Sequence, residues 1–323
     1  MSVNTSTSFT QTRDQLILDA FQLIGVYGIG RTVSSEDMTV AVSFLNKMIK
    51  AWGTKGLLLW CKEEATVFLS PSVSNYSFGQ TSTPAYAALA SDTIISQTTT
   101  AAVLGATTIN VINSAGMSVS DYVGVLQSDM SVFWTTIASI PNSTSIVLSS
   151  GTSTTVNQAA NVYTFTTLIN KPYRVLSCRR VWGFDSGVTT TIDEVVMNPL
   201  SHSDYYNLPL KSANGLPNQY YYDPQRDVGT LSLWQRPNDG AYRVNMTYER
   251  VMSDMLNVSD NFDLPQEWLE PLTWQLAIRL CPAFGKEKKL PSILPMAKQM
   301  LDDLLDFDTE IISVDFEPDD MGN

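Results

Sequence analysis

Hydrophobic residues recur at helical spacing in the first sixty residues and predict two helices. Thr12 and Gln15 fit a capping box at the start of the first helix, and Ser34 or Ser35 is suited to cap the second. The apolar positions are Leu16, Ile17, Ala20, Phe21 and Ile24 in the first helix and Ala41, Val42, Leu45, Met48, Ile49 and Trp52 in the second. We therefore expect an N-terminal helical hairpin over residues 1–65.

A second pattern, with apolar residues at alternate positions, begins near Thr66 and continues, with interruptions, to about Tyr248. Residues 91–167 form a distinct stretch within it, rich in Ser, Thr, Val, Ile and Ala. Short strands are predicted there at 108–112, 122–126, 134–140, 145–148 and 162–166. Strands at this spacing predict a small barrel or sandwich, inserted into a β-rich core region of residues 66–90 and 168–258.

The other strands of the core region are expected at 173–184, 189–197, 220–222, 230–234 and 241–248. The segment Asn238-Asp239-Gly240 gives a strong hairpin signal between the last two strands. Asp223-Pro224 predict another turn, and residues 198–207 are predicted as a short helix.

The last quarter of the chain returns to helical spacing. Asp263 is expected to cap a helix that starts at Leu264, and a second helix is predicted over 292–310. Both helices fall within residues 259–310, and an acidic and apolar arm, 311–323, follows them. The predicted buried stripes are Trp268, Leu272, Leu276 and Leu280 in the first helix and Ala297, Met300, Leu301, Leu304 and Leu305 in the second.

Helices at both ends around a β-rich middle predict an α+β fold. The 323 residues give room for two or three packing units. We expect the N- and C-terminal helices to pack as one bundle, with the β-rich middle and its inserted module on the flank.

Charged residues make up only 16% of the chain, against about 25% in an ordinary soluble domain, while aromatic residues are frequent. Such neutral, apolar surface is typical of subunits that assemble with one another. The net charge is −12, and neither Lys nor Arg occurs between Lys62 and Lys171 or after Lys298. This balance argues against DNA binding, which needs a basic stripe, but it suits the wall of a DNA conduit.

Neither a secretion signal nor a membrane span is expected. The first ten residues are polar, and no apolar run reaches the roughly 18 residues of a span. Cys61, Cys178 and Cys281 are widely spaced and indicate reduced structural thiols. We therefore expect a soluble protein made in a cytoplasm.

Residues suited to catalysis are few. The single histidine, His202, lies near Ser201 and Asp204, but adjacency in sequence is not the geometry of a triad, so a surface or capping role is favoured. One histidine and three scattered cysteines give no metal ligand set. The glycines within 25–30 match no nucleotide-binding motif and fit a helix–helix turn. We expect no cofactor.

Paired carboxylates leave glycan hydrolysis as the enzyme class that needs no histidine. The pairs are Glu63 with Glu64, Asp193 with Glu194, and Glu267 with Glu270. Solvation at strand ends explains the first two pairs, and the helix dipole explains the third. A protein that is not an enzyme is the favoured interpretation.

Aromatic residues are the candidate contact residues. Tyr220, Tyr221 and Tyr222 follow one another in a predicted strand and have no basic neighbours, which favours a subunit contact over stacking on sugars or bases. Trp234, in the next strand, is a fourth candidate.

Three groups of residues together suggest a family. The first is 45–52 with Gly56 and 57–60. The second contains Tyr205, Leu210-Lys211, 215–217, 220–224, 229–234 and Pro237, and the third contains 264–268, Leu276-Ala277, Leu280 and Phe284-Gly285. In this order they resemble the head-to-tail adaptor (connector) proteins of tailed phages, especially the short-tailed phage type called tail tubular protein A or tail accessory factor. The module at 91–167 departs from the smaller adaptors.

The resemblance implies a ring, usually of twelve subunits, between the portal of the capsid and the tail nozzle. Such a ring closes the packaged head and forms part of the channel through which genomic DNA is ejected without specific binding. The helical bundle is expected to line this channel, and the arm is expected to bind the portal through Ile311, Ile312, Val314 and Phe316. The aromatic candidates would then contact neighbouring subunits or the nozzle, in the virion at the capsid–tail junction.

Two other functions stay open at this point. One is a tail or baseplate protein whose β module binds a host glycan. The other is a virion peptidoglycan hydrolase that uses one of the carboxylate pairs.

Overall fold

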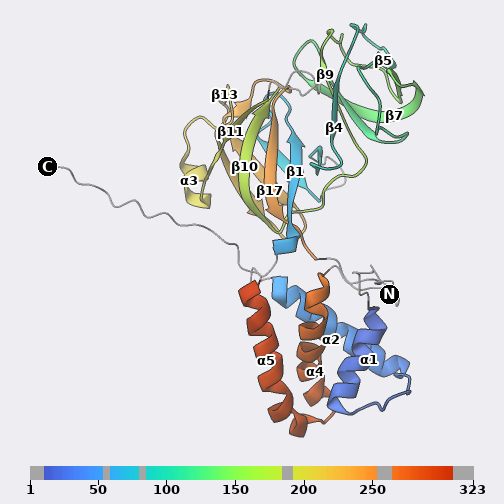
Figure 1. Cartoon of the computed structure of the whole chain (residues 1–323). Coiled ribbons are helices and arrows are strands. Elements are labelled where there is room, and N and C mark those ends of the chain that lie inside the picture. The colour runs from blue at the N-terminus through green and yellow to red at the C-terminus, as the bar shows by residue number, and fades with distance from the viewer. Residues whose placement is uncertain (1–10, 54–58, 80–84, 184–191, 253–263, 308–323) are drawn as a thin grey trace, which may run out of the picture. The chain divides into compact units, whose positions relative to one another are not determined.

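The computed structural model describes residues 11–53, 59–79, 85–183, 192–252 and 264–307 (Figure 1). The chain divides into two compact units. The helical unit is built from both ends of the chain, Met1–Cys61 and Met252–Asn323, and the β unit is Lys62–Val251. The predicted α+β class is confirmed, with a β-rich middle and helices in the C-terminal quarter.

Helix α1 (Arg13–Ile24) begins and ends where the sequence predicts. The Thr12 side chain accepts a hydrogen bond from the Gln15 amide, and the Gln15 side chain accepts one from the Thr12 amide, which completes the capping box. Gly25 follows the helix with a φ of 71°, a left-handed conformation that favours glycine. The helix boundaries are therefore set by local sequence.

Helix α2 (Ser35–Gly53) is capped by Ser34, whose Oγ accepts a hydrogen bond from the Asp37 amide at 3.2 Å. The Tyr27 hydroxyl donates to the Asp37 carboxylate and accepts from the Ser34 amide at 3.1 Å. The side chain of Tyr27 thus ties the α1–α2 connection to the start of α2.

The C-terminal part of the helical unit contains two 3₁₀ turns and two α-helices. They are the turn Gln266–Trp268, α4 (Leu269–Ala283), the turn Glu287–Lys289 and α5 (Leu290–Phe307). The first α-helix starts five residues after the predicted Leu264, because Pro265 is extended, with a ψ of 154°, and only a 3₁₀ turn follows it. The predicted cap, Asp263, lies outside the described residues.

Helices α1, α2, α4 and α5 share one hydrophobic core. Helix α4 lies between α1 and α5 and buries Leu272, Leu276 and Leu280 completely (Figure 1). Each fully buried leucine contributes about 1.5–3 kcal/mol of hydrophobic free energy. Before α4, the Trp268 ring meets Trp52 and Trp60 edge to face, with ring centroids 5.6 and 4.4 Å apart. Residues from both ends of the chain therefore complete the same core.

Two sheets of the β unit face each other across a second core. The five-stranded sheet contains, in spatial order, β11 (Asp193–Val196), β10 (Arg174–Trp182), β17 (Arg243–Glu249), β1 (Lys62–Phe68) and β3 (Ala87–Leu89). The four-stranded sheet contains β12 (Asn198–Pro199), β14 (Gln219–Pro224), β15 (Gly229–Trp234) and β2 (Asn75–Phe78), and β13 (Asn214–Gly215) pairs separately with β16 (Arg236–Pro237). Val67 and Met246 from the first sheet and Leu231 from the second meet in this core.

The inserted module, residues 91–167, folds as a six-stranded antiparallel half-barrel. Its strands, in spatial order, are β4 (Ile94–Gln97), β9 (Asn161–Phe165), β6 (Tyr122–Leu126), β7 (Val132–Asn142), β8 (Ser145–Leu148) and β5 (Thr108–Asn110). Val123, Ile137 and Val162 are buried in its own core. The predicted strands at 122–126 and 145–148 are confirmed, and the other three predictions differ by one or two residues at an end. The sequence reasoning missed β4.

Aspartates close the neck of the module. Asp92 accepts hydrogen bonds from the amides of Thr166 and Thr167 at 3.1 and 3.0 Å. The buried Asp121 accepts from the Ser118 amide and the Thr166 hydroxyl at 2.7 and 3.0 Å. Two of the three charged residues of the module are therefore structural, and its outer surface is almost neutral.

The hairpin predicted at Asn238-Asp239-Gly240 is wrong. Strands β15 and β17, on either side of this segment, belong to different sheets, so the turn carries the chain from one sheet to the other. Asp239 accepts a hydrogen bond from the Ala241 amide at 2.7 Å, and the Gly240 amide donates to the Met130 carbonyl at 2.9 Å. A Cβ on Gly240 would lie 2.8 Å from that carbonyl oxygen. The glycine thus permits close packing against the module.

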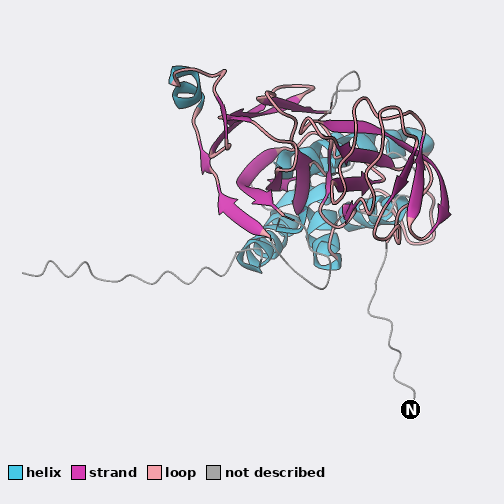
Figure 2. Cartoon of the chain, turned by 90° about the horizontal axis from the view of Figure 1, so that it is seen from above, coloured by secondary structure: helices cyan, strands magenta, loops and turns pink. Residues whose placement is uncertain are grey.

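Two further boundaries differ from prediction. Asp223-Pro224 form the end of β14, which pairs with β15 up to Pro224, and do not form the predicted turn. Of the predicted helix 198–207, only His202–Asn207 is helical and forms α3. Figures 1 and 2 place α3 at the margin of the β unit, on the side away from the inserted module.

Candidate interaction surfaces

Strand β14 sorts the three predicted contact tyrosines onto two faces, because alternate side chains of a strand point in opposite directions. Tyr220 is 3% exposed and belongs to the core between the sheets. Tyr222 packs against the same core, and its hydroxyl donates to the Pro172 carbonyl at 2.6 Å. Burial raises the pKa of Tyr220 to about 12. Only Tyr221 points to the outer face, so the ring of Tyr220 is unavailable to a partner.

Tyr221 forms the floor of an aromatic platform with α3. Its ring stacks on Tyr205 with centroids 5.4 Å apart and planes 23° from parallel. His202 meets Tyr221 edge to face at 5.8 Å and lies against Tyr206 at 4.5 Å. The ammonium of Lys211 lies 4.8 Å from the Tyr206 ring centroid. We call His202, Tyr205, Tyr206, Lys211 and Tyr221 the platform: His202 and Tyr206 are exposed, Lys211 and Tyr221 are half-buried, and Tyr205 is buried beneath them.

The hydrogen bonds at the start of α3 are those of a helix cap. Ser201 Oγ accepts from the Asp204 amide at 3.2 Å and donates to the Asp204 carboxylate at 2.7 Å. His202 is exposed, and its ring lies against those of Tyr206 and Tyr221. The segment therefore has the geometry of a short capped helix, with the serine as the cap.

The fourth contact candidate, Trp234, ends β15 and is half-buried. Its indole N–H is buried without a hydrogen-bond partner among the described residues. The four candidates for portal binding, Ile311, Ile312, Val314 and Phe316, lie outside the described residues. Tyr221 is therefore the predicted contact residue that joins the platform. Trp234 pairs with Gln219, two residues from Tyr221 along β14, and lies on the same face of the sheet as Tyr221.

Arginines engage three of the six carboxylates singled out in the sequence, Glu63, Glu64 and Glu194. Glu63 accepts from the Tyr248 hydroxyl at 2.9 Å and from Arg250 at 2.8 Å. Arg179 lies 2.6 Å from Glu64 and 3.2 Å from Glu194, joining β1 to β11 across the face of the sheet. Burial, together with the hydrogen bond to Glu63, raises the pKa of Tyr248. These carboxylates hold strands together.

The other three predicted carboxylates are Asp193, on an edge strand, and Glu267 and Glu270, near the start of α4. Asp193 is exposed on β11, the edge strand, where it pairs with Trp182. Glu267 lies in the first 3₁₀ turn, and Glu270 lies in the first turn of α4, where the helix dipole favours an acid.

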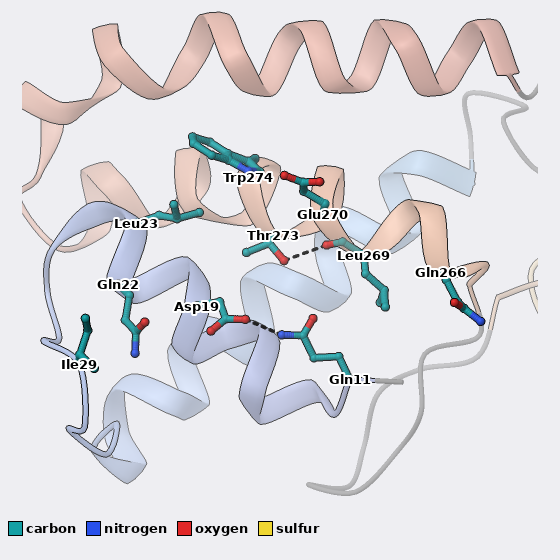
Figure 3. A pocket seen from close by; sticks show the side chains of 10 residues that line it. All are labelled: Gln11, Asp19, Gln22, Leu23, Ile29, Gln266, Leu269, Glu270, Thr273 and Trp274. Atoms are coloured by element: carbon teal, nitrogen blue, oxygen red, sulfur yellow. Dashed lines mark hydrogen bonds between the residues drawn. The ribbon is translucent and has the colours of Figure 1, made fainter. Parts of the chain in front are cut away.

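A groove between α1 and α4 is a further candidate surface, one that was not predicted from the sequence (Figure 3). It has a volume of about 770 Å³. Its lining residues are Gln11, Asp19, Gln22, Leu23, Ile29, Gln266, Leu269, Glu270, Thr273 and Trp274. Asp19 accepts a hydrogen bond from Gln11, and Thr273 donates to the Leu269 carbonyl at 2.8 Å. The groove thus combines an apolar floor with two acidic residues.

Some groove residues carried a signal in the sequence. Leu23 and Trp274 fall outside the buried stripes of their helices, which is what an apolar residue at a subunit contact does. Ile29, between two glycines, is 95% exposed. Apolar residues that lie outside the predicted buried stripes are therefore the sequence signal for this groove.

The described residues hold no group of three or more His, Cys, Asp or Glu placed to bind a metal ion. Cys61, Cys178 and Cys281 are buried, and burial raises the pKa of the Cys178 thiol. No helix in the described part of the chain has the length and apolar character that crossing a membrane requires.

Comparison with protein families identifies a relationship over the C-terminal half of the chain. Residues 143–308 match the family described as SU10 adaptor protein, and the matched range runs from the second half of the inserted module to the end of α5. No curated protein matches the chain. Because the match covers just over half of the chain, the protein belongs to the SU10 adaptor protein family, a family of phage head–tail adaptors that have a structural role in the virion.

Proposed function

We propose that the protein is a head-to-tail adaptor of the short-tailed phage type, which forms a ring, of twelve subunits, between the portal and the tail nozzle. The ring closes the packaged head and forms part of the DNA ejection channel. Membership of the adaptor family is the observation that carries this proposal. The shared core of the terminal helices supports their role as the bundle along the channel.

The charge of the chain supports a passage that does not retain DNA. A net charge of −12 repels the phosphate backbone, and a duplex that is repelled by the wall passes without being held. The portal-binding arm and the contact at Tyr221 complete the proposed assembly, with the arm binding the portal and the platform binding a neighbouring subunit or the nozzle.

The glycan-binding alternative loses support in the module itself. Sugars bind to exposed aromatic faces, yet every aromatic ring of the module is buried or half-buried. These rings are Tyr122, Phe133, Trp134, Tyr163 and Phe165. The hydrolase alternative loses support because Glu63, Glu64 and Glu194 are already engaged by arginines.

Electron microscopy of purified particles tests the location and the ring. We expect density for the helical unit and the β unit, repeated around the axis between portal and nozzle. Particles in which the protein is absent from the capsid–tail junction would refute the proposal.

The arm is tested separately with purified portal rings. We expect replacement of Ile311, Ile312, Val314 and Phe316 by serine to abolish portal binding. A matched variant, Asp319→Asn with Asp320→Asn, changes the same arm without removing apolar side chains and should still bind. Equal binding by the serine variant would show that the portal contact lies elsewhere.

A further inference from the structure

We propose that α5 of one copy docks in the α1–α4 groove of the next copy. This inference rests on the proposed function, because it specifies how neighbouring subunits of the adaptor ring meet. The contact is heterologous, with two different surfaces in each copy, and a heterologous contact that closes by rotation produces a ring.

The groove has the chemistry to receive an apolar helix that carries a cation. Leu23, Leu269 and Trp274 contribute apolar surface, and Asp19 and Glu270 are exposed at its edges. None of the residues that line the groove is a lysine or an arginine. An apolar side chain in the groove would remove these surfaces from water, and a cation beside them would pair with the acids.

Helix α5 has a second row of apolar residues that the core of its own copy covers only in part: Leu290 and Leu301 pack partly against that core, and Leu294 is exposed. Ile293, Ala297 and Leu304 are buried, at no more than 6% exposure, in the core shared with α4. About 100° around the helix lies a row of partly exposed leucines at helical spacing, with a lysine at its centre. The row is Leu290, Leu294, Lys298, Leu301 and Leu305, and Leu294 is 52% exposed.

The row on α5 and the groove residues on α4 lie at the same height along the helix axes. The Gln275 side chain donates to the Ala297 carbonyl at 3.0 Å, which sets α4 and α5 at the same height. Because the two helices run in opposite directions, Lys298 and Trp274 then lie on one level, each about 1.5 Å beyond that bond. Glu270 is about one helical turn further along, within reach of a lysine side chain. If the ring axis is parallel to these helices, rotation from one copy to the next leaves the height of each residue unchanged. Lys298 then lies at the height of Trp274 in the neighbouring copy and within reach of its Glu270.

Helix α2 is the other candidate within a second copy. Its outer stripe contains the exposed Val40 and the half-buried Phe44, with Lys47 as the cation. The ammonium of Lys47, however, lies 5.8 Å from the ring centroid of Phe44 in its own helix. The cation of α2 is thus already engaged, while Lys298 has no ion pair among the described residues, which favours α5.

Charge exchange tests the pairing. We expect Lys298→Glu and Glu270→Lys each to lower the recovery of assembled rings on portals at least tenfold, because each places like charges together. The double variant should restore recovery to within threefold of the wild type. Lys288→Glu, at an exposed lysine just before α5, is the matched control and should assemble normally. Circular dichroism of each variant before assembly reports folding.

Disulfide cross-linking in assembled rings tests proximity independently of charge. We expect copies with Leu294→Cys and Gln22→Cys to form a ladder of covalently linked adaptors on oxidation. The control pair is Leu294→Cys with Ser43→Cys, in which the second cysteine lies on α2 and not in the groove. It should form no cross-linked ladder. The three native cysteines are buried and do not compete.

The outcomes separate this inference from the proposed function. Rings that assemble normally with the charge reversals, or that cross-link through Ser43 or to another virion protein, would overturn the α5 contact and leave the adaptor ring in place. Wild-type particles without a ring would instead refute the proposed function, and the α5 contact with it.

Discussion

The ring of Tyr86 lies flat against the indole of Trp134, with centroids 4.1 Å apart and planes 8° from parallel. Tyr86 precedes β3 of the five-stranded sheet, and Trp134 lies in β7 of the inserted module. Phe68 joins the same cluster, with its ring centroid 4.7 Å from that of Tyr163 and 5.7 Å from that of Phe165. The module therefore packs against the five-stranded sheet through an aromatic core.

Replacing Phe68 by alanine should uncouple the module from the sheets. Phe68 is 2% exposed, and removal of a buried phenylalanine costs about 3–5 kcal/mol. We expect a lower free energy of unfolding in urea and faster proteolysis at the neck, near residues 91 and 167. Phe68→Leu keeps most of the volume and should cost less than about 1.5 kcal/mol. Equal losses for the two variants would show that the cluster does not depend on ring packing.

The buried Tyr163 should make the β unit sensitive to alkali. Its hydroxyl bonds to the Gly240 and Ala241 carbonyls and accepts from Asn161, and burial raises its pKa from 10.0 to about 12. A folded-state pKa above the unfolded value means that the stabilisation is complete below pH 10 and is lost as the pH rises through about 12.

Equilibrium unfolding at several pH values between 9 and 12 measures this effect. Tyr163→Phe should be less stable at pH 9, because it loses the hydroxyl's bonds, but its stability should fall less steeply with pH. Other buried tyrosines, Tyr76 and Tyr222 among them, also have raised pKa values and should keep part of the slope. A slope identical to that of the wild type would mean that Tyr163 does not titrate in this range.

Local signals predicted the helices and strands that they control directly. The capping box at Thr12 and the left-handed Gly25 fix α1 through contacts within one turn. Strand β6 matches its prediction because its alternating pattern coincides with the core of the module. The start of α4 differs because the backbone of Pro265, and not an apolar pattern, decides where the helix begins.

Features that depend on contacts between distant parts of the chain could not be predicted from the sequence. Asn238-Asp239-Gly240 has the composition of a hairpin turn, but which strands pair depends on contacts far along the chain, such as that of Gly240 with Met130. The three tyrosines of β14 look alike in sequence, and only the position of the core separates Tyr220 from Tyr221. The α1–α4 groove could not be predicted because its walls are some 240–260 residues apart in the chain.

Two of the three glycines between α1 and α2, Gly25 and Gly28, should respond differently to alanine. Gly25 has a φ of 71°, where a side chain costs roughly 1–2 kcal/mol, so Gly25→Ala should lower the free energy of unfolding of the helical unit by about that amount. Gly28 has an ordinary φ, and a Cβ there would meet nothing within 4 Å. Gly28→Ala should therefore be neutral or stabilising by up to about 1 kcal/mol. Thermal unfolding followed by circular dichroism compares them, and a destabilising Gly28→Ala would contradict the argument.

Two adjacent tyrosines of β14 provide the sharpest test of the assignment of faces. Tyr220→Ala removes a ring from the core and should cost about 3–5 kcal/mol of global stability, measured by urea unfolding. Tyr221→Ala removes only the platform floor, so global stability should fall by about 1 kcal/mol or less.

The effect of Tyr221→Ala should instead be local, at α3. Six residues are too few for a helix to persist alone, so α3 depends on Tyr205 stacking on Tyr221. Hydrogen exchange at the amides of Tyr205 and Leu208, which bond to the carbonyls of Ser201 and Tyr205, should accelerate in Tyr221→Ala, while exchange in the paired strands β1 and β17 stays unchanged. If α3 keeps its protection without the Tyr221 ring, its cap at Ser201 holds it, and the platform is not the support that the stacking implies.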